Sequence, residues 1–211
     1  MAVIITKIEP QKKRKDRYSV YTDEQFLIGV SQDTLIKYNL HAGKQLDASE
    51  INKIKSAESE RKLRDQAYRF LSRRAHSCKE LYDKLIIKEY PPSAINNIID
   101  EFVSNGYLND TEFTKIFINE EIKLKKSGPL LIKNKLIKKG VNREIIDDLL
   151  SSIYDENEQI ENCTYLVLKK YKQVNREQKN TVINYLRNKG YYWEQISLAL
   201  AQILWEENNE E

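Results

Sequence analysis

The spacing of hydrophobic residues changes once along the chain, near Ser49. Before that point, apolar residues alternate with other residues in runs that begin near Val3, Tyr18 and Phe26. Alternation with a period of two is typical of β-strands with one buried face. Thr22–Gln25 separates the last two runs as a hairpin loop. The first 31 residues are therefore predicted to form strands, and the basic run 12–17 is expected to be a polar, exposed connection.

Helices are predicted from the end of these strands onward. Ser31 is placed to cap a short helix, and Gly43 ends that region. Ser49 is then expected to cap a long helix, whose apolar residues recur at helical spacing. The rest of the chain reads as helical and is punctuated by four glycines, namely Gly106, Gly128, Gly140 and Gly190.

A repeat of about 50 residues organises the helical part. Leu85, Leu136 and Leu186 occupy equivalent places in three middle helices, each followed by a further apolar helix. The second and third middle helices end in Lys-Gly, whereas the first has Glu89 at the glycine position and two prolines after it. We predict an N-terminal β-hairpin and short-helix region, three three-helix repeats and an acidic tail, at residues 1–48, 49–109, 110–154, 155–206 and 207–211.

Composition narrows the class of protein. The 211 residues are 40% hydrophobic and 32% charged, which excludes a disordered chain and favours an elongated helical protein. Cys78 and Cys163 lack a Cys-x-x-Cys spacing, so they are expected to be small, buried apolar residues in a reducing compartment. No run approaches the length of a membrane span or a signal peptide. A cytoplasmic protein is expected.

No catalytic constellation is visible in the sequence. A phosphate-binding Gly-x-x-x-x-Gly-Lys loop is absent, so no nucleotide site is expected. His41 and His76 lie far apart without cysteine partners, which favours surface or capping roles over metal binding. The paired acids Asp147–Asp148 and Glu120–Glu121 read as solvated. We therefore predict a protein that is not an enzyme and that has neither a cofactor nor a metal.

Basic residues are the candidates for partner binding, because packing does not require them. The stretch from Lys123 to Arg143 holds eight basic residues and no acid. In the second middle helix, three lysines at spacings of three and four are expected to share one face. A solvated surface remains the alternative interpretation of these charges. The predicted binding residues are Arg61, Arg69, Arg73, Lys123, Lys125, Lys126, Lys135, Lys138 and Lys139.

Three segments carry a resemblance to a known family. Ala67–Leu85, which contains Arg73-Arg74-Ala75-His76-Ser77, resembles the leading signature of the RecX regulatory proteins. Gly106–Phe113 is similar to their second signature. The third signature matches Gly128, Leu136 and Lys139-Gly140. The resemblance covers about residues 58–206, and the N-terminal β-hairpin looks like the extension that some members carry. It implies a mainly α fold with three tandem three-helix repeats that form an elongated, curved body.

The resemblance also implies a function. RecX proteins bind along the groove of a RecA recombinase filament on DNA, and they limit filament growth, ATP hydrolysis and strand exchange during DNA repair. This chain is therefore expected to act as a monomer on the RecA filament, with single- or double-stranded DNA as a further target of its basic faces. The alternative is a general nucleic-acid-binding protein whose three-helix units imitate helix-turn-helix domains.

Overall fold

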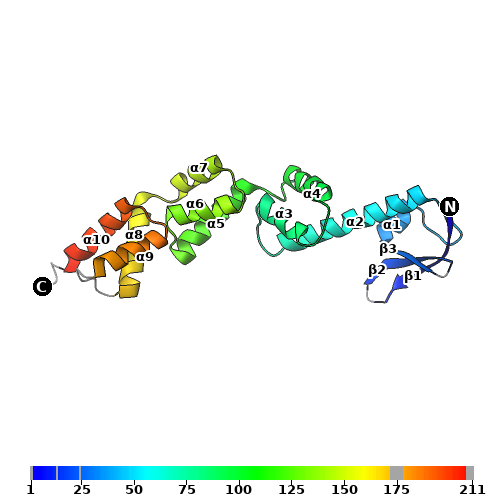
Figure 1. The fold of residues 1–211 in the computed structure, drawn as a ribbon, viewed down its shortest axis with the longest axis horizontal. Helices are drawn as coiled ribbons and strands as arrows, with labels where there is room; N and C mark the ends of the chain where they lie inside the picture. Colours follow the sequence, from blue (N-terminus) through cyan, green and yellow to red (C-terminus); the bar gives the residue numbers. More distant parts are fainter. Residues whose placement is uncertain (1, 13, 24, 172–177, 208–211) are drawn as a thin grey trace. The chain divides into compact units, whose positions relative to one another are not determined.

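The protein is mainly helical, with a small sheet at its N-terminus (Figure 1). The computed structural model describes residues 2–12, 14–23, 25–171 and 178–207. The chain divides into two compact units, one formed by residues 1–72 with 85–98 and the other by residues 73–84 with 99–211. The predicted fold class, helical repeats behind an N-terminal region of strands, is confirmed. Within the described residues, no helix is both long enough and apolar enough to span a membrane.

The N-terminal sheet is antiparallel and larger than the predicted hairpin. Three consecutive strands form a meander, and a short fourth strand pairs with the other side of the first, which gives the order β3-β2-β1-β4. The strands extend further than predicted, because β2 begins at Arg14, inside the expected connection, and Thr22 pairs with Gln25 within the expected hairpin loop. The strands are β1 (Val3–Gln11), β2 (Arg14–Thr22), β3 (Gln25–Ser31) and β4 (Gln45–Leu46).

The helix after the sheet begins where the sequence predicts it. Ser31 is the N-cap of α1 (Gln32–Lys37), and its side chain accepts a hydrogen bond from the Thr34 amide. Gly43 has a φ of 88°, a left-handed conformation that suits a residue without a Cβ. The next helix, α2 (Ala48–Leu71), is capped by Asp47.

Ser49 is therefore the wrong cap. Asp47 accepts a hydrogen bond from the Glu50 amide, and the Glu50 side chain accepts one from the Asp47 amide. This capping box satisfies two amides that the first helical turn leaves free, so the helix starts two residues earlier than predicted. Ser49 lies inside the first turn.

A buried ion pair fastens the sheet to α2. Arg17 is 5% exposed, and its Nη2 lies 2.9 Å from Glu58 Oε2. Glu58 also accepts hydrogen bonds from the Ser31 amide and the Thr34 hydroxyl. The predicted exposed connection is thus wrong at Arg17, because strand alternation turns this side chain inward, where Glu58 compensates its charge. The sheet and α2 also share an apolar core that includes Ile54.

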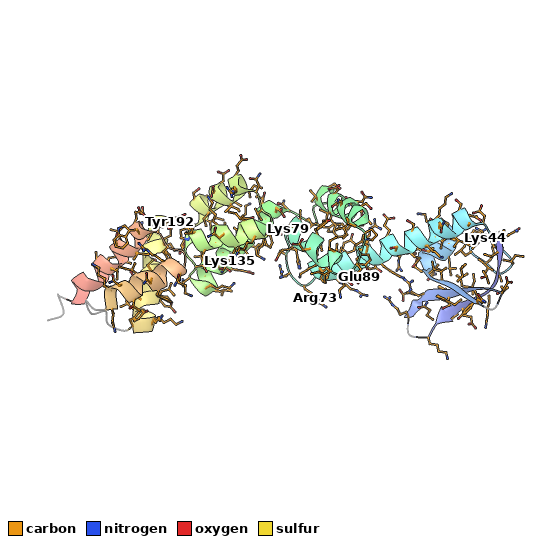
Figure 2. The ribbon with its side chains drawn as sticks, in the orientation of Figure 1. Lys44, Arg73, Lys79, Glu89, Lys135 and Tyr192 are labelled. Carbon is orange, nitrogen blue, oxygen red and sulfur yellow. The ribbon has the colours of Figure 1, made fainter. Side chains whose placement is uncertain are left out.

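The first middle helix, α3 (Cys78–Ile86), ends in an unusual turn. Glu89 has a φ of 63°, so it adopts the left-handed conformation that Gly140 and Gly190 adopt in the later repeats. Figure 2 labels Glu89 in this turn. A residue with a Cβ takes this conformation at some cost, and the prolines that follow prevent the helix from continuing. The next helix, α4 (Pro92–Ser104), follows directly.

The second unit contains the other two repeats. Its helices are α5 (Asp110–Lys125), α6 (Pro129–Lys138), α7 (Arg143–Ile153), α8 (Glu156–Tyr171), α9 (Lys179–Asn188) and α10 (Trp193–Glu207). Asn109 caps α5 by accepting bonds from two amides of the first turn. Leu136 and Leu186 are fully buried in one continuous core, which confirms the repeat spacing. The side chain of Leu204, the side chains of Glu206 and Glu207, and residues 208–211 lie outside the described residues.

The middle helices of the three repeats are α3, α6 and α9. The end of α6 lies against the start of α3, and the end of α9 lies against the start of α6. The Gly128 amide donates to the Lys189 carbonyl at 2.8 Å, and a Cβ on Gly128 would lie 2.3 Å from the Gly190 carbonyl carbon. In the equivalent joint one repeat earlier, the Ser77 hydroxyl donates to the Lys139 carbonyl at 2.7 Å. The glycine pair permits a backbone approach that no other residue would allow. Most signature residues at these joints therefore have a structural role.

Candidate anion-binding groove

A groove lined with lysines runs across the second unit. It has a volume of about 470 Å³ and is bordered by the end of α5, the start of α6, and parts of α8 and α9. Within the described part of the chain, its lining contains six lysines and no acidic residue. We call it the lysine groove, and its charged and aromatic members are Lys123, Lys125, Lys126, Lys135, Lys169, Lys189, Tyr165 and Tyr185.

A strained residue forms one border of the lysine groove. Lys126 ends α5 with a φ of 50°, in the left-handed region that few residues other than glycine adopt. Its carbonyl accepts a hydrogen bond from the Tyr191 hydroxyl at 2.9 Å, and Tyr191 is in turn bonded to the hydroxyl of Tyr154. These buried tyrosines hold the turn in place. Strained positions of this kind concentrate at functional sites, since the surrounding structure has to maintain them.

A buried carboxylate orients two of the lysines. Glu121 is 1% exposed and lies 2.6 Å from Lys125 Nζ and 2.5 Å from Lys135 Nζ. It also accepts a bond from the Ser127 hydroxyl at 2.7 Å. Burial favours the neutral form of Glu121, but the hydrogen bonds from the two lysines and Ser127 outweigh burial and lower its pKa. The prediction that Glu121 is solvated is therefore wrong, because lysines from α5 and α6 enclose it.

Tyrosine rings lie among the lysines. The Nζ atoms of Lys126 and Lys169 are 5.8 Å and 5.5 Å from the centroid of Tyr165, whose exposed fraction is 48%. Lys189 Nζ lies 5.8 Å from the centroid of Tyr185. Cations at these distances are attracted by the negative face of the ring. The groove thus combines positive charge with aromatic surface, which suits an anionic partner that has planar groups.

The structure brings together only some of the predicted binding residues. Lys123, Lys125, Lys126 and Lys135 all line the lysine groove. Lys138 is exposed but lies outside the groove lining. Lys139 is instead bonded to Glu80 at the joint between repeats.

Lys135, Lys138 and Lys139 therefore do not form the single cationic face that was predicted. Acids outside the stretch from Lys123 to Arg143 pair with two of these lysines. Glu121 binds Lys135, and Glu80 binds Lys139. Figure 2 labels Lys135 on α6.

The predicted arginines do not form one face of a helix. Arg61 and Arg69 lie on α2 in the first unit, and Arg69 is exposed. Arg73 is also exposed but lies beyond the end of α2 at Leu71, because the chain turns before it (Figure 2). The expected common face is thus wrong for Arg73. The two remaining arginines stay candidates that are independent of the lysine groove.

Sequence reasoning missed half of the groove. Lys169 and Lys189 each follow a tyrosine by four residues, Tyr165 and Tyr185 respectively. Residues four apart lie on one face of a helix, so each pair presents a ring and an ammonium together. This repeated spacing is a usable signal. The mutual approach of α8 and α9 to the end of α5 has no such signal in the sequence.

The other titratable candidates point to structural roles. His76 is 3% exposed, so the expected surface position is wrong, and its ring bonds to the Arg74 carbonyl and to Lys84 Nζ. Burial and Asp110 raise the pKa of the Cys78 thiol to about 12, which makes it unreactive. Among the described residues, no group of three or more His, Cys, Asp or Glu is placed to hold a metal ion.

Comparisons with known proteins give consistent matches along the chain. Residues 3–47, 64–102 and 109–150 match the models for the "Regulatory protein RecX N-terminal domain", the "RecX, first three-helix domain" and the "RecX, second three-helix domain". The regulatory protein RecX of Listeria welshimeri is 37% identical over 89% of this chain and 71% of its own. That of Clostridium tetani is 30% identical over 95% of this chain and 94% of its own.

Solved structures agree with these matches. A crystal structure of a regulatory protein RecX superimposes with a TM-score of 0.72 at 26% identity, and the match covers 94% of this chain and 99% of the other. The crystal structure of RecX from Lactobacillus salivarius gives a TM-score of 0.62 at 24% identity, over 70% of this chain and 97% of the other. The second structure supports the fold alone.

Proposed function

Because the chain belongs to the RecX family of regulatory proteins, we propose that it binds the filament that RecA recombinase forms on DNA and inhibits it. Inhibition here means slower filament extension, ATP hydrolysis and strand exchange. The observation that carries the proposal is the lysine groove, a concentrated cationic surface without acidic lining in the described residues. A filament on DNA presents phosphates and acidic side chains, and either would be attracted to such a surface.

The experiment measures ATP hydrolysis by RecA on single-stranded DNA as the protein is added. We expect the parent protein to lower the rate. A variant with Lys123, Lys169 and Lys189 changed to glutamine should inhibit more weakly, most clearly at low salt, because it lacks three charges that attract the filament. The side chains of Lys123 and Lys169 are exposed and that of Lys189 is half-buried, so the fold should be retained.

A matched control removes the same charge elsewhere. Lys53, Lys55 and Lys88 are exposed lysines of the first unit. Their triple change to glutamine alters the net charge equally but leaves the lysine groove intact. If both triple variants inhibit as well as the parent, the groove is not the filament-binding surface. If the parent itself leaves ATP hydrolysis unchanged, the proposed function is wrong.

General binding of nucleic acid is the second candidate, and the same groove favours it. A protein of this kind would bind naked DNA without recombinase, with an affinity that falls steeply as salt rises. A regulator of the filament would lower RecA activity at protein concentrations well below those that saturate naked DNA, whether or not it also binds naked DNA at higher concentrations. Titrations with and without recombinase at one salt concentration separate the two.

A further inference from the structure

The lysine groove contains an exposed ring that the core does not require. Tyr165 lies on α8 between two lysines, and nearly half of its surface is open to solvent. The two residues that follow it, Leu166 and Val167, belong to the hydrophobic core instead. An exposed aromatic face between two ammonium groups can stack a planar group while the cations hold charges beside it.

We propose that the lysine groove binds a single-stranded nucleic acid, with one base stacked on Tyr165 and adjacent phosphates on Lys126 and Lys169. The proposal rests on the function proposed above, and it specifies which component of the filament this groove contacts. Stacking needs a base whose face is open. In a duplex, neighbouring base pairs cover both faces, so only an unpaired strand meets this requirement.

The chemistry of the groove favours phosphates over the carboxylates of a protein partner. Its lining in the described residues contains lysines but no arginine. Lysine binds phosphate and carboxylate alike as a point charge, so the ammonium groups alone do not distinguish the two. An exposed ring adds affinity for a base and adds little for a carboxylate. The combination of lysines with Tyr165 therefore fits a strand of nucleic acid.

Tyr185 has a different role in the groove. Lys170 Nζ lies 4.0 Å from the centroid of Tyr185, and the ring of Tyr171 packs edge-on against it at 6.1 Å. Its ring is therefore already occupied by a cation and a second ring. Tyr185 contacts Lys189, which lines the groove, and Lys170, which lies outside the groove lining, and Tyr165 provides the surface for stacking.

The experiment uses fluorescence anisotropy of a labelled oligothymidylate, without recombinase, and a labelled abasic strand of the same length. The abasic strand has the same phosphates but no bases. Tyr165→Leu should weaken binding of the oligothymidylate by about 5- to 100-fold, the effect of one lost base stack. Binding of the abasic strand should not change. Tyr165→Phe should bind both strands as the parent does, because it keeps the ring.

Two controls separate stacking from general effects. Tyr192 is 43% exposed and does not line the groove, so Tyr192→Leu should leave both affinities unchanged. Lys169→Gln should weaken both strands and reduce the salt dependence by about 0.7 per lost phosphate contact on a single strand. Lys53→Gln, at an exposed position in the first unit, should change neither the affinity for the two strands nor the salt dependence.

Three outcomes would overturn the assignment. In the first, Tyr165→Leu weakens the abasic strand as much as the oligothymidylate, so the ring acts on structure and not on a base. In the second, duplex DNA binds as tightly as the single strand. In the third, polyglutamate competes as well as the oligothymidylate, which would assign the groove to a protein surface. If the parent binds as proposed but has no effect on RecA, the function proposed above fails while this assignment stands.

Discussion

Glu80 is expected to stabilise the second unit in a way that disappears in acid. Its carboxylate accepts bonds from Arg74, 3.1 Å and 3.2 Å long, and from Lys139 at the far side of the joint. Burial disfavours its charged form, but the bonds and charges of Arg74 and Lys139 outweigh burial and lower its pKa from 4.5 to about 2. We predict that Glu80→Gln destabilises the protein at neutral pH.

The size of the expected loss of stability follows from the lowered pKa of Glu80. The difference of roughly 2.5 between the two pKa values corresponds to about 3.5 kcal/mol, since a difference of one is worth about 1.4 kcal/mol. The side chain of Arg74 is 49% exposed, so solvent screens part of this interaction. A cost of about 1–2 kcal/mol is therefore expected. Because folding lowers the pKa of Glu80, the stabilisation is present above about pH 5 and is lost as the pH falls toward 2.

The assay is urea unfolding followed by far-ultraviolet circular dichroism, repeated from about pH 7 down to about pH 3. The free-energy difference between the parent and Glu80→Gln should stay constant from about pH 7 to about pH 5 and then shrink as the pH falls toward 3. Glu112→Gln is the matched control, because Glu112 forms an exposed ion pair with Lys115 and should change stability by less than about 0.5 kcal/mol. A difference that stays constant down to pH 3 would refute the reasoning.

Three further changes test the packing, each measured by urea unfolding at neutral pH. Leu136→Ala should cost about 2–5 kcal/mol through a cavity in the core, whereas Leu124→Ala, at a 79% exposed position, should cost less than about 0.5 kcal/mol. Arg17→Met should cost about 3–5 kcal/mol because it leaves Glu58 buried and unpaired, and a second change, Glu58→Leu, should recover most of that loss. Gly128→Ala should cost at least about 1–3 kcal/mol because the joint has no room for a methyl group; a cost near zero would mean that the joint opens easily.

The sequence is informative wherever structure follows from neighbouring residues. Period-two alternation located the strands, and Ser31 was identified as a cap because its side chain reaches an amide three positions ahead. The burial of Leu85 and its two counterparts followed from the repeat. The choice of Ser49 over Asp47 failed because both residues can cap a helix. Which one does so depends on where β4 ends, and β4 ends at Leu46, immediately before Asp47.

Contacts between distant residues were the part that could not be predicted. Arg17 and Glu58 are 41 residues apart, and nothing in either segment indicates the other. Glu121 read as a solvated acid because its partner Lys135 belongs to the next helix. The same limit applies to the lysine groove. Its members on α5 and α6 form one basic stretch of sequence, but Lys169 joins them only through the packing of α8.

The lysine groove departs from what stability alone would favour. Clustered ammonium groups repel one another, and the left-handed conformation of Lys126 adds strain. Glu121 offsets part of the repulsion, and the rings of Tyr165 and Tyr185 attract some of the remaining charges. A surface that served only solubility would not need a buried carboxylate to hold two of its lysines in place. Local features that oppose stability occur most often at functional sites. An anionic partner would relieve the repulsion between the lysines that the free protein retains. This argument favours the groove over the scattered basic residues of α2 as the surface that meets the filament.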